Sequence, residues 1–321
     1  MLRSRFGAAS KNELGMAGYL VTGGCGFIGS HLADALVRSG HRVRILDNLS
    51  TGKRDNSPPA AELVIGDVTD RATVRRCAEG VDGIFHLAAV ASVETSRRDW
   101  LGSHAVNLTG AINVFDAARR DGRPGVKVVY ASSAAVYGDA APVPAAETDP
   151  PRPVTPYGAD KLGCELHARV ATLLYGVPTV GLRPFNIYGP RQDPSSPYSG
   201  VISIFTDRLR RNLPITIYGD GQQVRDFVAV ADAVAFFLAA MAAEDAAGEV
   251  FNICTGRGTT IADLAHLVAD RLGVRPTIEG AAPRQGDIRT SIGDPARAAR
   301  TLRCTAGIGV RQGLAALLGQ A

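Results

Sequence analysis

Tyr157 and Lys161 are residues whose types and spacing could carry acid–base chemistry. Four positions apart on a predicted helix, they would share one face. A phenol titrates near ~10 when unperturbed, and a neighbouring ammonium favours the phenolate. That phenolate could take a proton from an alcohol, while Ser133, at the end of a predicted strand, could hydrogen-bond the same oxygen. An exposed helix pair without function is the alternative.

Three glycines at a spacing of three, Gly23, Gly26 and Gly29, separate a short apolar run from a helical pattern. This order of strand, turn and helix is typical of dinucleotide binding. The first glycine would make the turn, the second would let backbone approach a pyrophosphate at the helix N-terminus, and the third would let helix and strand pack closely. A second apolar run ends at Asp47, where an acid would meet the adenosine ribose hydroxyls. The alternative is a structural turn and a surface Asp47.

The composition indicates an ordinary globular protein. The chain has 321 residues, of which 45% are hydrophobic and 21% charged, so it is not disordered. This length allows one large domain or two smaller ones. The net charge is +4, but the arginines are scattered, which favours solvated helix faces over a nucleic-acid surface.

Five cysteines lie far apart in the sequence and form no CxxC pair. Such a set argues against a disulfide framework and against a zinc site, so we expect no metal and a cytoplasmic location. Residues 1–17 lack a long apolar core and are expected to be an extension rather than a signal peptide or membrane span. No other stretch is apolar enough to cross a bilayer.

Apolar runs alternate with helical patterns along the first part of the chain, which predicts an α/β fold with a doubly wound parallel (Rossmann) sheet. A ligand should lie at the carboxyl ends of its strands. The predicted strands are 19–22, 43–46, 63–68, 84–89, 126–131 and 179–182, and the longer predicted helices are 100–120 and 156–175.

From residue 183 the regularity loosens, and prolines and glycines break the chain. We expect a smaller mixed α/β domain that binds substrate, formed by about 183–225 and 255–321. The dinucleotide-binding domain would comprise 18–182 and about 226–254, with one return to the large sheet. Predicted helices are 201–211, 232–243, 261–272 and 312–318, and predicted strands are 215–218, 226–228 and 250–253.

Other polar residues near predicted strand ends have open roles. Asp67 could accept a hydrogen bond from the adenine amino group, or could equally begin a helix. Ala88 and Ala89 are small enough for a flat cofactor to pass, whereas His86 is expected only to pack. Asn107, inside a predicted helix, would hold backbone or a water if it were buried.

Several motifs together resemble the extended short-chain dehydrogenase/reductases, of the NAD-dependent sugar-nucleotide epimerase/dehydratase family. Within it, the bacterial UDP-glucose and UDP-N-acetylglucosamine 4-epimerases are most similar. The resemblance extends from about residue 18 to the C-terminus. The matching stretches are 22–31, 132–138, 157–161, 183–190, 218–227 and 283–287.

The resemblance implies roles position by position. Ser133, Tyr157 and Lys161 match the catalytic triad, and NAD is the implied cofactor. The implied cofactor contacts are Gly23, Gly26, Phe27, Ile28, Asp47, Asn48, Asp67, Val68, Leu87, Ala88, Ala89, Tyr157, Lys161 and Pro184. The implied contacts to a UDP-sugar are Ser133, Tyr157, Asn186, Val201, Thr216, Tyr218, Arg225, Arg284, Asp287 and Ser291. Among these, Arg225 and Arg284 would clamp the diphosphate, which suits the guanidinium fork.

Departures from the family pattern narrow the expected activity. Family dehydratases carry an Asp-Glu pair after the catalytic Ser or Thr, and decarboxylases carry a Glu at the second of these positions. Here Ala134 and Ala135 stand there, so neither elimination nor decarboxylation has its proton donor. The reaction that these departures leave possible is reversible oxidation at C4 of the sugar, and hence 4-epimerisation.

Substrate and cofactor details are expected as follows. Ser291 is small where a bulky Tyr would restrict the sugar pocket, so the protein should accept UDP-N-acetylglucosamine as well as UDP-glucose. The alternative functions are a 4-epimerase of UDP-glucuronate, another sugar-nucleotide oxidoreductase of this family, and a non-catalytic NAD sensor. Asp47 would repel a 2′-phosphate and so favours NAD over NADP, although Arg44, Lys53 and Arg54 argue the other way. The resemblance implies a homodimer formed through helices 100–120 and 156–175, and no nucleic-acid or membrane partner.

Overall fold

The computed structural model describes residues 16–122, 124–139, 142–193, 200–283 and 288–319. The expected extension 1–17 therefore lies almost wholly outside the described residues. Within the described ranges, no helix combines the length and the apolar character needed to cross a membrane.

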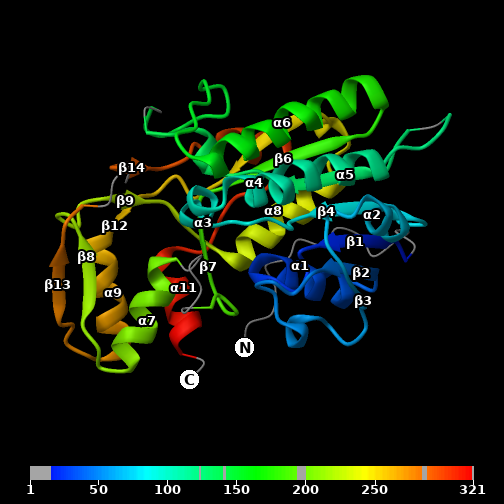
Figure 1. Ribbon diagram of the computed structural model, residues 1–321. Coiled ribbons are helices and arrows are strands. Elements are labelled where there is room, and N and C mark those ends of the chain that lie inside the picture. Colours follow the sequence, from blue (N-terminus) through cyan, green and yellow to red (C-terminus); the bar gives the residue numbers. More distant parts are fainter. Residues whose placement is uncertain (1–15, 123, 140–141, 194–199, 284–287, 320–321) are drawn as a thin grey trace.

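A seven-stranded, all-parallel sheet forms the larger part of the molecule (Figure 1). Its strand order is β11-β6-β5-β4-β1-β2-β3, so the order reverses beside β1, as in doubly wound folds. This confirms the predicted fold class. The strands are β1 (Gly18–Thr22), β2 (Arg42–Asp47), β3 (Glu62–Ile65), β4 (Gly83–His86), β5 (Lys127–Ala131), β6 (Thr179–Pro184) and β11 (Glu249–Ile253).

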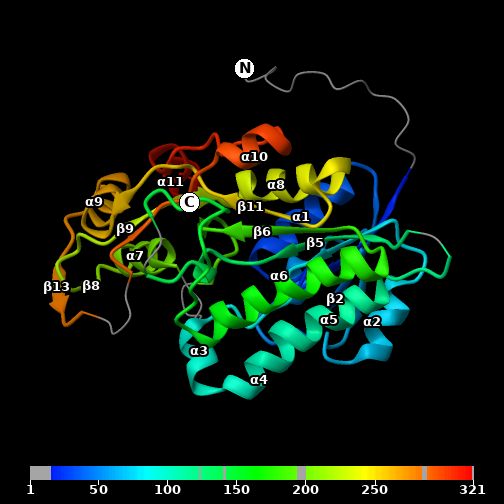
Figure 2. The same cartoon turned by 90° about the horizontal axis from the view of Figure 1, so that it is seen from above.

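Helices cover both faces of this sheet (Figure 2). Neighbouring strand residues alternate between the two hydrophobic clusters: Leu20 faces one and Val21 the other, as do Ile84 and Phe85. This period of two is what a sheet buried on both faces requires. One face carries α1 (Phe27–Arg38), α8 (Val230–Ala242) and α10 (Ala296–Thr301), and the other carries α2 (Arg71–Ala78), α5 (Gly110–Ala117) and α6 (Pro156–Tyr175).

The remaining elements form smaller sheets around a third hydrophobic cluster, beyond the carboxyl ends of the large sheet (Figure 1). The helices here are α7 (Val201–Arg210), α9 (Ile261–Leu272) and α11 (Val310–Leu318). The paired strands are β7 (Asn186–Tyr188) with β10 (Phe227–Ala229), β8 (Ile215–Tyr218) with β13 (Ile278–Ala281), and β9 (Val224–Arg225) between β12 (Thr259–Thr260) and β14 (Thr290–Ser291).

Several predicted elements differ in detail. The strand expected at 226–228 is split, because Asp226 turns inward and is fully buried between β9 and β10. The strand expected to reach Ala89 ends at His86, and the following residues form the floor of a cavity. The helix expected at 100–120 comprises α4 (Trp100–His104), a π-helical turn (Ala105–Thr109) and α5. The sequence reading missed α2 and α3 (Val93–Arg98), which begin at the capping residues Asp70 and Ser92.

Candidate active site

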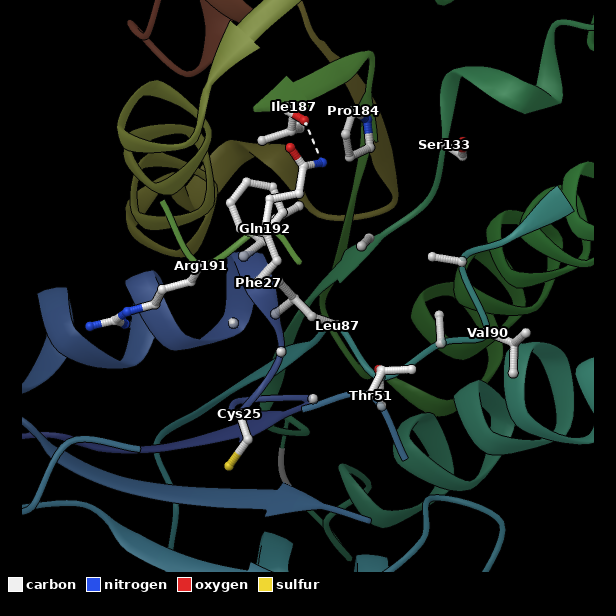
Figure 3. Close-up of a pocket in the computed structure, with 18 of the residues that line it drawn as sticks. Cys25, Phe27, Thr51, Leu87, Val90, Ser133, Pro184, Ile187, Arg191 and Gln192 are labelled. Atoms are coloured by element: carbon white, nitrogen blue, oxygen red, sulfur yellow. Dashed lines mark hydrogen bonds between the residues drawn. The ribbon is translucent and has the colours of Figure 1, made fainter. Parts of the chain in front are cut away.

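A cavity of about 920 Å³ opens at the carboxyl ends of the large sheet. Its walls come from the ends of β1, β2, β4, β5 and β6 and from the start of α7. This is where ligands bind in doubly wound folds. Figure 3 shows Cys25, Leu87, Ser133 and Pro184 lining it from four different strand ends.

Most of the predicted site residues meet at this cavity. Those that line it are Gly23, Gly26, Phe27, Ile28, Asp47, Asn48, Val68, Leu87, Ala88, Ala89, Ser133, Tyr157, Lys161, Pro184, Asn186 and Val201. The predicted residues placed behind or beyond its walls are Asp67, Thr216, Tyr218, Arg225 and Ser291. Arg284 and Asp287 lie outside the described residues.

The glycine turn has the geometry that its spacing suggested. Gly23 has a φ of +71°, and a Cβ there would lie 2.7 Å from the Ala88 nitrogen. A Cβ on Gly29 would lie 2.2 Å from the Gly23 carbonyl oxygen, so only glycine lets α1 pack this closely on the turn. Both positions therefore need glycine for the fold itself.

Gly26 is different, because a Cβ there would meet only the Gly23 oxygen, at 3.2 Å. It lines the cavity as the N-cap of α1, and no side chain in the described part of the chain caps that helix. The first N–H groups of α1 therefore lack side-chain partners, and the helix dipole adds positive potential. This cradle fits the diphosphate of a dinucleotide.

Asp47 is held rigidly at the end of β2. Its Oδ2 accepts from the Cys25 nitrogen at 2.9 Å, and its Oδ1 accepts from the Leu49 nitrogen at 2.8 Å. Gly52 packs so closely that a Cβ would lie 2.9 Å from Oδ1. The carboxylate thus lies at the cavity wall in one orientation, as an acid that binds ribose hydroxyls would require.

Asp67 is occupied by its own neighbours. Its Oδ2 accepts from Asn48 at 2.7 Å, and its Oδ1 accepts from both the nitrogen and the hydroxyl of Thr69. Partial burial alone would raise the pKa of Asp67, but these hydrogen bonds outweigh it and lower the pKa. Asp67 therefore remains ionised and positions Asn48, which itself lines the cavity.

The helix that carries Tyr157 and Lys161 begins and ends where its sequence dictates. Thr155 caps the N-terminus by accepting from the Gly158 nitrogen, Pro156 occupies the first turn, and Gly176 ends the helix in the left-handed conformation. Lys161 is 2% exposed, and its Nζ donates to the Ala131 carbonyl oxygen at 2.7 Å. The same Nζ lies 5.9 Å from the centre of the Tyr157 ring.

Ser133 is brought towards Tyr157 by a close contact of backbones. A Cβ on Gly158 would lie 2.7 Å from the Ala135 oxygen, so glycine lets the first turn of α6 approach the loop that carries Ser133. The Ser133 hydroxyl oxygen accepts from the Ala135 nitrogen at 3.1 Å. Its hydrogen is therefore available to donate to a ligand oxygen.

Asn107 supports one wall from inside the π-helical turn. It is fully buried, its Oδ1 accepts from the Val90 nitrogen at 2.8 Å, and its Nδ2 donates to the Val90 oxygen at 3.2 Å. The expectation that a buried Asn107 holds backbone is thus confirmed. Val90 itself lines the cavity (Figure 3).

His86 packs within the sheet, as expected. Its Nδ1 lies 2.7 Å from the Thr22 hydroxyl. Burial, with the nearby Lys161 ammonium, lowers the pKa of His86 to about 3, so the ring stays neutral. Its neutral side chain is structural, which leaves proton transfer to the residues that line the cavity.

Five of the residues expected to contact substrate lie on the smaller sheets: Asn186, Thr216, Tyr218, Arg225 and Ser291. Arg225 on β9 is in register with Ser291 on β14 and with Thr259 on β12. Neighbouring residues in register project from the same face of a sheet, so Arg225 and Ser291 belong to one surface. Thr216 and Tyr218 likewise share a face of β8, two positions apart.

The sequence reading missed several polar residues at the site. Lys53 and Asp193 both line the cavity and form an ion pair at 2.9 Å. Ser132, which also lines the cavity, forms a buried cluster with Glu165 and Arg183. Glu165 could have been noticed, because it continues the four-residue spacing of Tyr157 and Lys161 along α6. The Lys53–Asp193 pair joins distant loops and carries no sequence signal.

The fold and this cavity define a dinucleotide-binding protein of the doubly wound class. The chain belongs to the NAD dependent epimerase/dehydratase family, whose sequence profile matches residues 19–254. The resemblance, the enzyme class and the predicted NAD cofactor are thereby confirmed. No group of His, Cys, Asp and Glu that could hold a metal occurs in the described ranges.

Individual relatives agree over nearly the whole chain. The UDP-glucose 4-epimerase of Mycolicibacterium smegmatis is 37% identical over 303 residues, covering 92% of this chain and 96% of the relative. The structure of Thermotoga maritima UDP-glucose 4-epimerase with UDP-glucose has a TM-score of 0.89 and 37% identity, covering 94% and 97% of the two chains. The Methanobrevibacter ruminantium UDP-N-acetylglucosamine 4-epimerase, in complex with UDP-N-acetylmuramic acid, has a TM-score of 0.89 and 32% identity, covering 95% and 97%.

Proposed function

We propose that this protein is an NAD-dependent 4-epimerase of UDP-hexoses. The observation that carries the proposal is the meeting of Tyr157, Lys161 and Ser133 at a dinucleotide cavity whose serine loop continues with Ala134 and Ala135. An elimination or decarboxylation would need a carboxylic acid at those positions. Proton exchange with an alcohol needs only the phenol, the ammonium and the serine.

The residues divide the work as follows. NAD, when bound, supplies reversible hydride exchange with C4 of the sugar. Tyr157 takes the proton of the 4-hydroxyl as the alcohol becomes a ketone, and returns it once the sugar has turned over. Lys161 stabilises the phenolate by its charge, and Ser133 donates to the same sugar oxygen.

The nucleotide must be held while the sugar rotates. We propose that Asn186, Arg225 and Arg284 hold the diphosphate and that Asp287 and Tyr218 hold the nucleoside. Arginine suits this task because its fork binds phosphate oxygens in pairs. The second region, about 183–225 and 255–321, would then be the substrate domain, and 18–182 with about 226–254 the cofactor domain.

We propose that UDP-glucose and UDP-N-acetylglucosamine are both substrates, because the small Ser291 on β14 is paired with Arg225 on β9, where a bulky side chain would narrow the space for an N-acetyl group. The Methanobrevibacter ruminantium relative, an epimerase of the acetylated sugar, supports this reading. UDP-glucuronate is the second candidate, since arginines at this end could meet a carboxylate. A non-catalytic NAD sensor is disfavoured, because the Tyr157–Lys161 pair is intact.

Incubation of the purified protein with UDP-glucose, UDP-N-acetylglucosamine and UDP-glucuronate, followed by separation of the products, tests the proposal. We expect the 4-epimers of the first two sugars to form without added cofactor and without accumulation of NADH. Net formation of NADH would show an oxidoreductase instead. Conversion of UDP-glucuronate alone would overturn the assignment to neutral hexoses.

We further propose a homodimer formed through the helical segment 100–120, which contains α4 and α5, and through α6. The outer face of α6 carries apolar side chains at helical spacing, and Leu173 on it is 75% exposed. Patches of this kind mark interfaces. Light scattering should give twice the mass of one chain for the wild type and a single chain for Leu173→Glu; a monomeric wild type would contradict the proposal. The exposed apolar residues are Trp100, Leu101, Leu166, Val170, Leu173, Leu174 and Tyr175.

A further inference from the structure

Tyr157, Lys161 and Glu165 follow one another at intervals of four along α6 and so lie in one row. Glu165 is 9% exposed and Lys161 is 2% exposed. Opposite charges one turn apart, both shielded from water, attract each other strongly. A direct pairing of Lys161 with Glu165 would draw the ammonium away from Tyr157.

The structure shows a different pairing. Arg183, 3% exposed at the end of β6, donates from Nε to Glu165 Oε1 at 2.8 Å and from Nη2 to Oε2 at 2.7 Å. The Ser132 hydroxyl donates to the same Oε1. Both carboxylate oxygens are therefore occupied, and no ion pair between Glu165 and Lys161 occurs among the described residues.

Arg183 is itself held in place by a second contact. Its guanidinium stacks on the Tyr137 ring, 4.8 Å from the centroid. The Tyr137 hydroxyl donates to Asn252 Oδ1 at 2.7 Å, on the neighbouring strand β11. The fork of Arg183 therefore has one orientation, towards Glu165.

Three of the other titratable groups around this row, His86, Cys164 and Tyr130, are uncharged near neutral pH. Burial lowers the pKa of His86 to about 3, raises the pKa of Cys164 to about 11 and raises that of Tyr130 well above its usual value. Asp160 lies 2.7 Å from the His104 ring. The groups that face the row are His86 on β4, Tyr130 on β5, Asp160 and Cys164 on α6, Arg183 on β6, and Tyr137 and Glu147 in the loops beyond.

We propose that Arg183 and Glu165 are positioning residues: Arg183 engages Glu165 so that the Lys161 ammonium stays directed at Tyr157. This rests on the proposed function for its meaning in catalysis. Lys161 donates to the Ala131 oxygen, and its two further donors remain available for the phenolate and the cofactor. Glu165 also ties α6 to Ser132, the neighbour of Ser133, so one carboxylate aligns both sides of the reacting site.

The proposal predicts that substitutions of Arg183 and of Glu165 shift the titration of Tyr157 in opposite directions. In Arg183→Met, Glu165 loses its partner and attracts Lys161, so the Tyr157 phenolate is less favoured and titrates at higher pH. In Glu165→Gln, the unpaired Arg183 adds positive charge, so the phenolate titrates at lower pH. In the double variant Glu165→Gln/Arg183→Met, both charges are gone and the titration returns towards that of the wild type.

The test measures the tyrosinate absorbance of each variant against the same variant carrying Tyr157→Phe, and the acid limb of kcat with UDP-glucose. We expect a shift of about one pH unit or more in each direction for the single variants. Circular dichroism checks that each variant folds. If Arg183→Met fails to fold, two results still test the proposal. These are the downward shift of the Tyr157 titration in Glu165→Gln and its return towards the wild-type value in the double variant.

Shifts in the same direction, or no shift in either single variant, would overturn the proposal and leave the pair a merely structural one. The absorbance titration needs no turnover. If the wild type epimerises no UDP-hexose, the proposed function fails, but the opposite shifts of Tyr157 would still establish how Arg183 and Glu165 act.

Discussion

The two ends of the molecule that we propose to bind cofactor and substrate are built differently. The cofactor end is built on seven parallel strands, and its contacts come from strand ends and from backbone in a glycine turn. The substrate end is built on strands of two to four residues, and its expected contacts are side chains such as Arg225 and Ser291. On the proposed function, the first arrangement would fix one cofactor rigidly, whereas the second could change its sugar by single substitutions.

Tyr157→Phe tests where the two ends meet, and we expect the largest effect from it. Turnover should fall about 10²- to 10⁴-fold, because the proton of the sugar alcohol loses its acceptor, while NAD remains bound. Initial rates of UDP-glucose epimerisation and cofactor content after purification measure this. Tyr175→Phe, at the far end of α6 with an exposed ring over Arg119, is the matched control. Retained turnover in Tyr157→Phe would exclude phenolate chemistry.

Arg225→Ala tests whether the substrate end acts through side chains. Loss of a charge-assisted contact to the diphosphate should raise KM for UDP-glucose roughly ten- to a hundredfold, with NAD affinity unchanged. Arg271→Ala, at an exposed arginine in the last turn of α9, removes the same charge as a control. An unchanged KM in Arg225→Ala would show that the diphosphate binds to other residues.

Gly26→Ala tests whether the cofactor end acts through backbone. Gly26 has a φ of −76°, which alanine adopts readily, and a Cβ there would meet only the Gly23 oxygen. Since the Gly23 oxygen must yield by a few tenths of an ångström, we expect a modest loss of stability, while NAD affinity drops about tenfold because the methyl occupies the diphosphate cradle. Cofactor titration and thermal unfolding separate the two effects. Gly280→Ala, with open space around its Cβ position, is the control. Unchanged NAD affinity would contradict the assigned cradle.

The same contrast explains how far the sequence could be read. The helix predicted at about 156–175 agrees with α6, because Thr155, Pro156 and Gly176 mark its ends. The glycine turn, the acid after the second strand and the other strand ends of the cofactor end could be predicted in the same way, because each is marked by a local pattern in the sequence. The inward turn of Asp226 was not predicted, because its partners Thr255, Gly256 and Gly293 lie far away in the sequence.

Pairings between distant segments account for the other omissions. Arg183 and Glu165 come from different elements, and nothing local in either stretch indicates their contact. The strands β9, β12 and β14 have two residues each, which is too short for any periodicity. For Arg225 and Ser291 the roles came from family resemblance, and only the structure shows that the two are in register.

Ser291→Tyr probes the substrate end most finely, and we expect the smallest effect from it. Ser291 lies beside Arg225 on adjacent strands, so a tyrosine would narrow the space for an N-acetyl group while leaving the diphosphate contacts intact. The ratio of kcat/KM for UDP-N-acetylglucosamine to that for UDP-glucose should fall about tenfold, within the range that steric exclusion in a pocket provides. Ser291→Ala, which keeps the pocket open, should leave the ratio unchanged. If Ser291→Tyr does not alter the ratio, another residue bounds the sugar pocket. The choice of sugar at the substrate end would then depend less on single side chains than its short strands indicate.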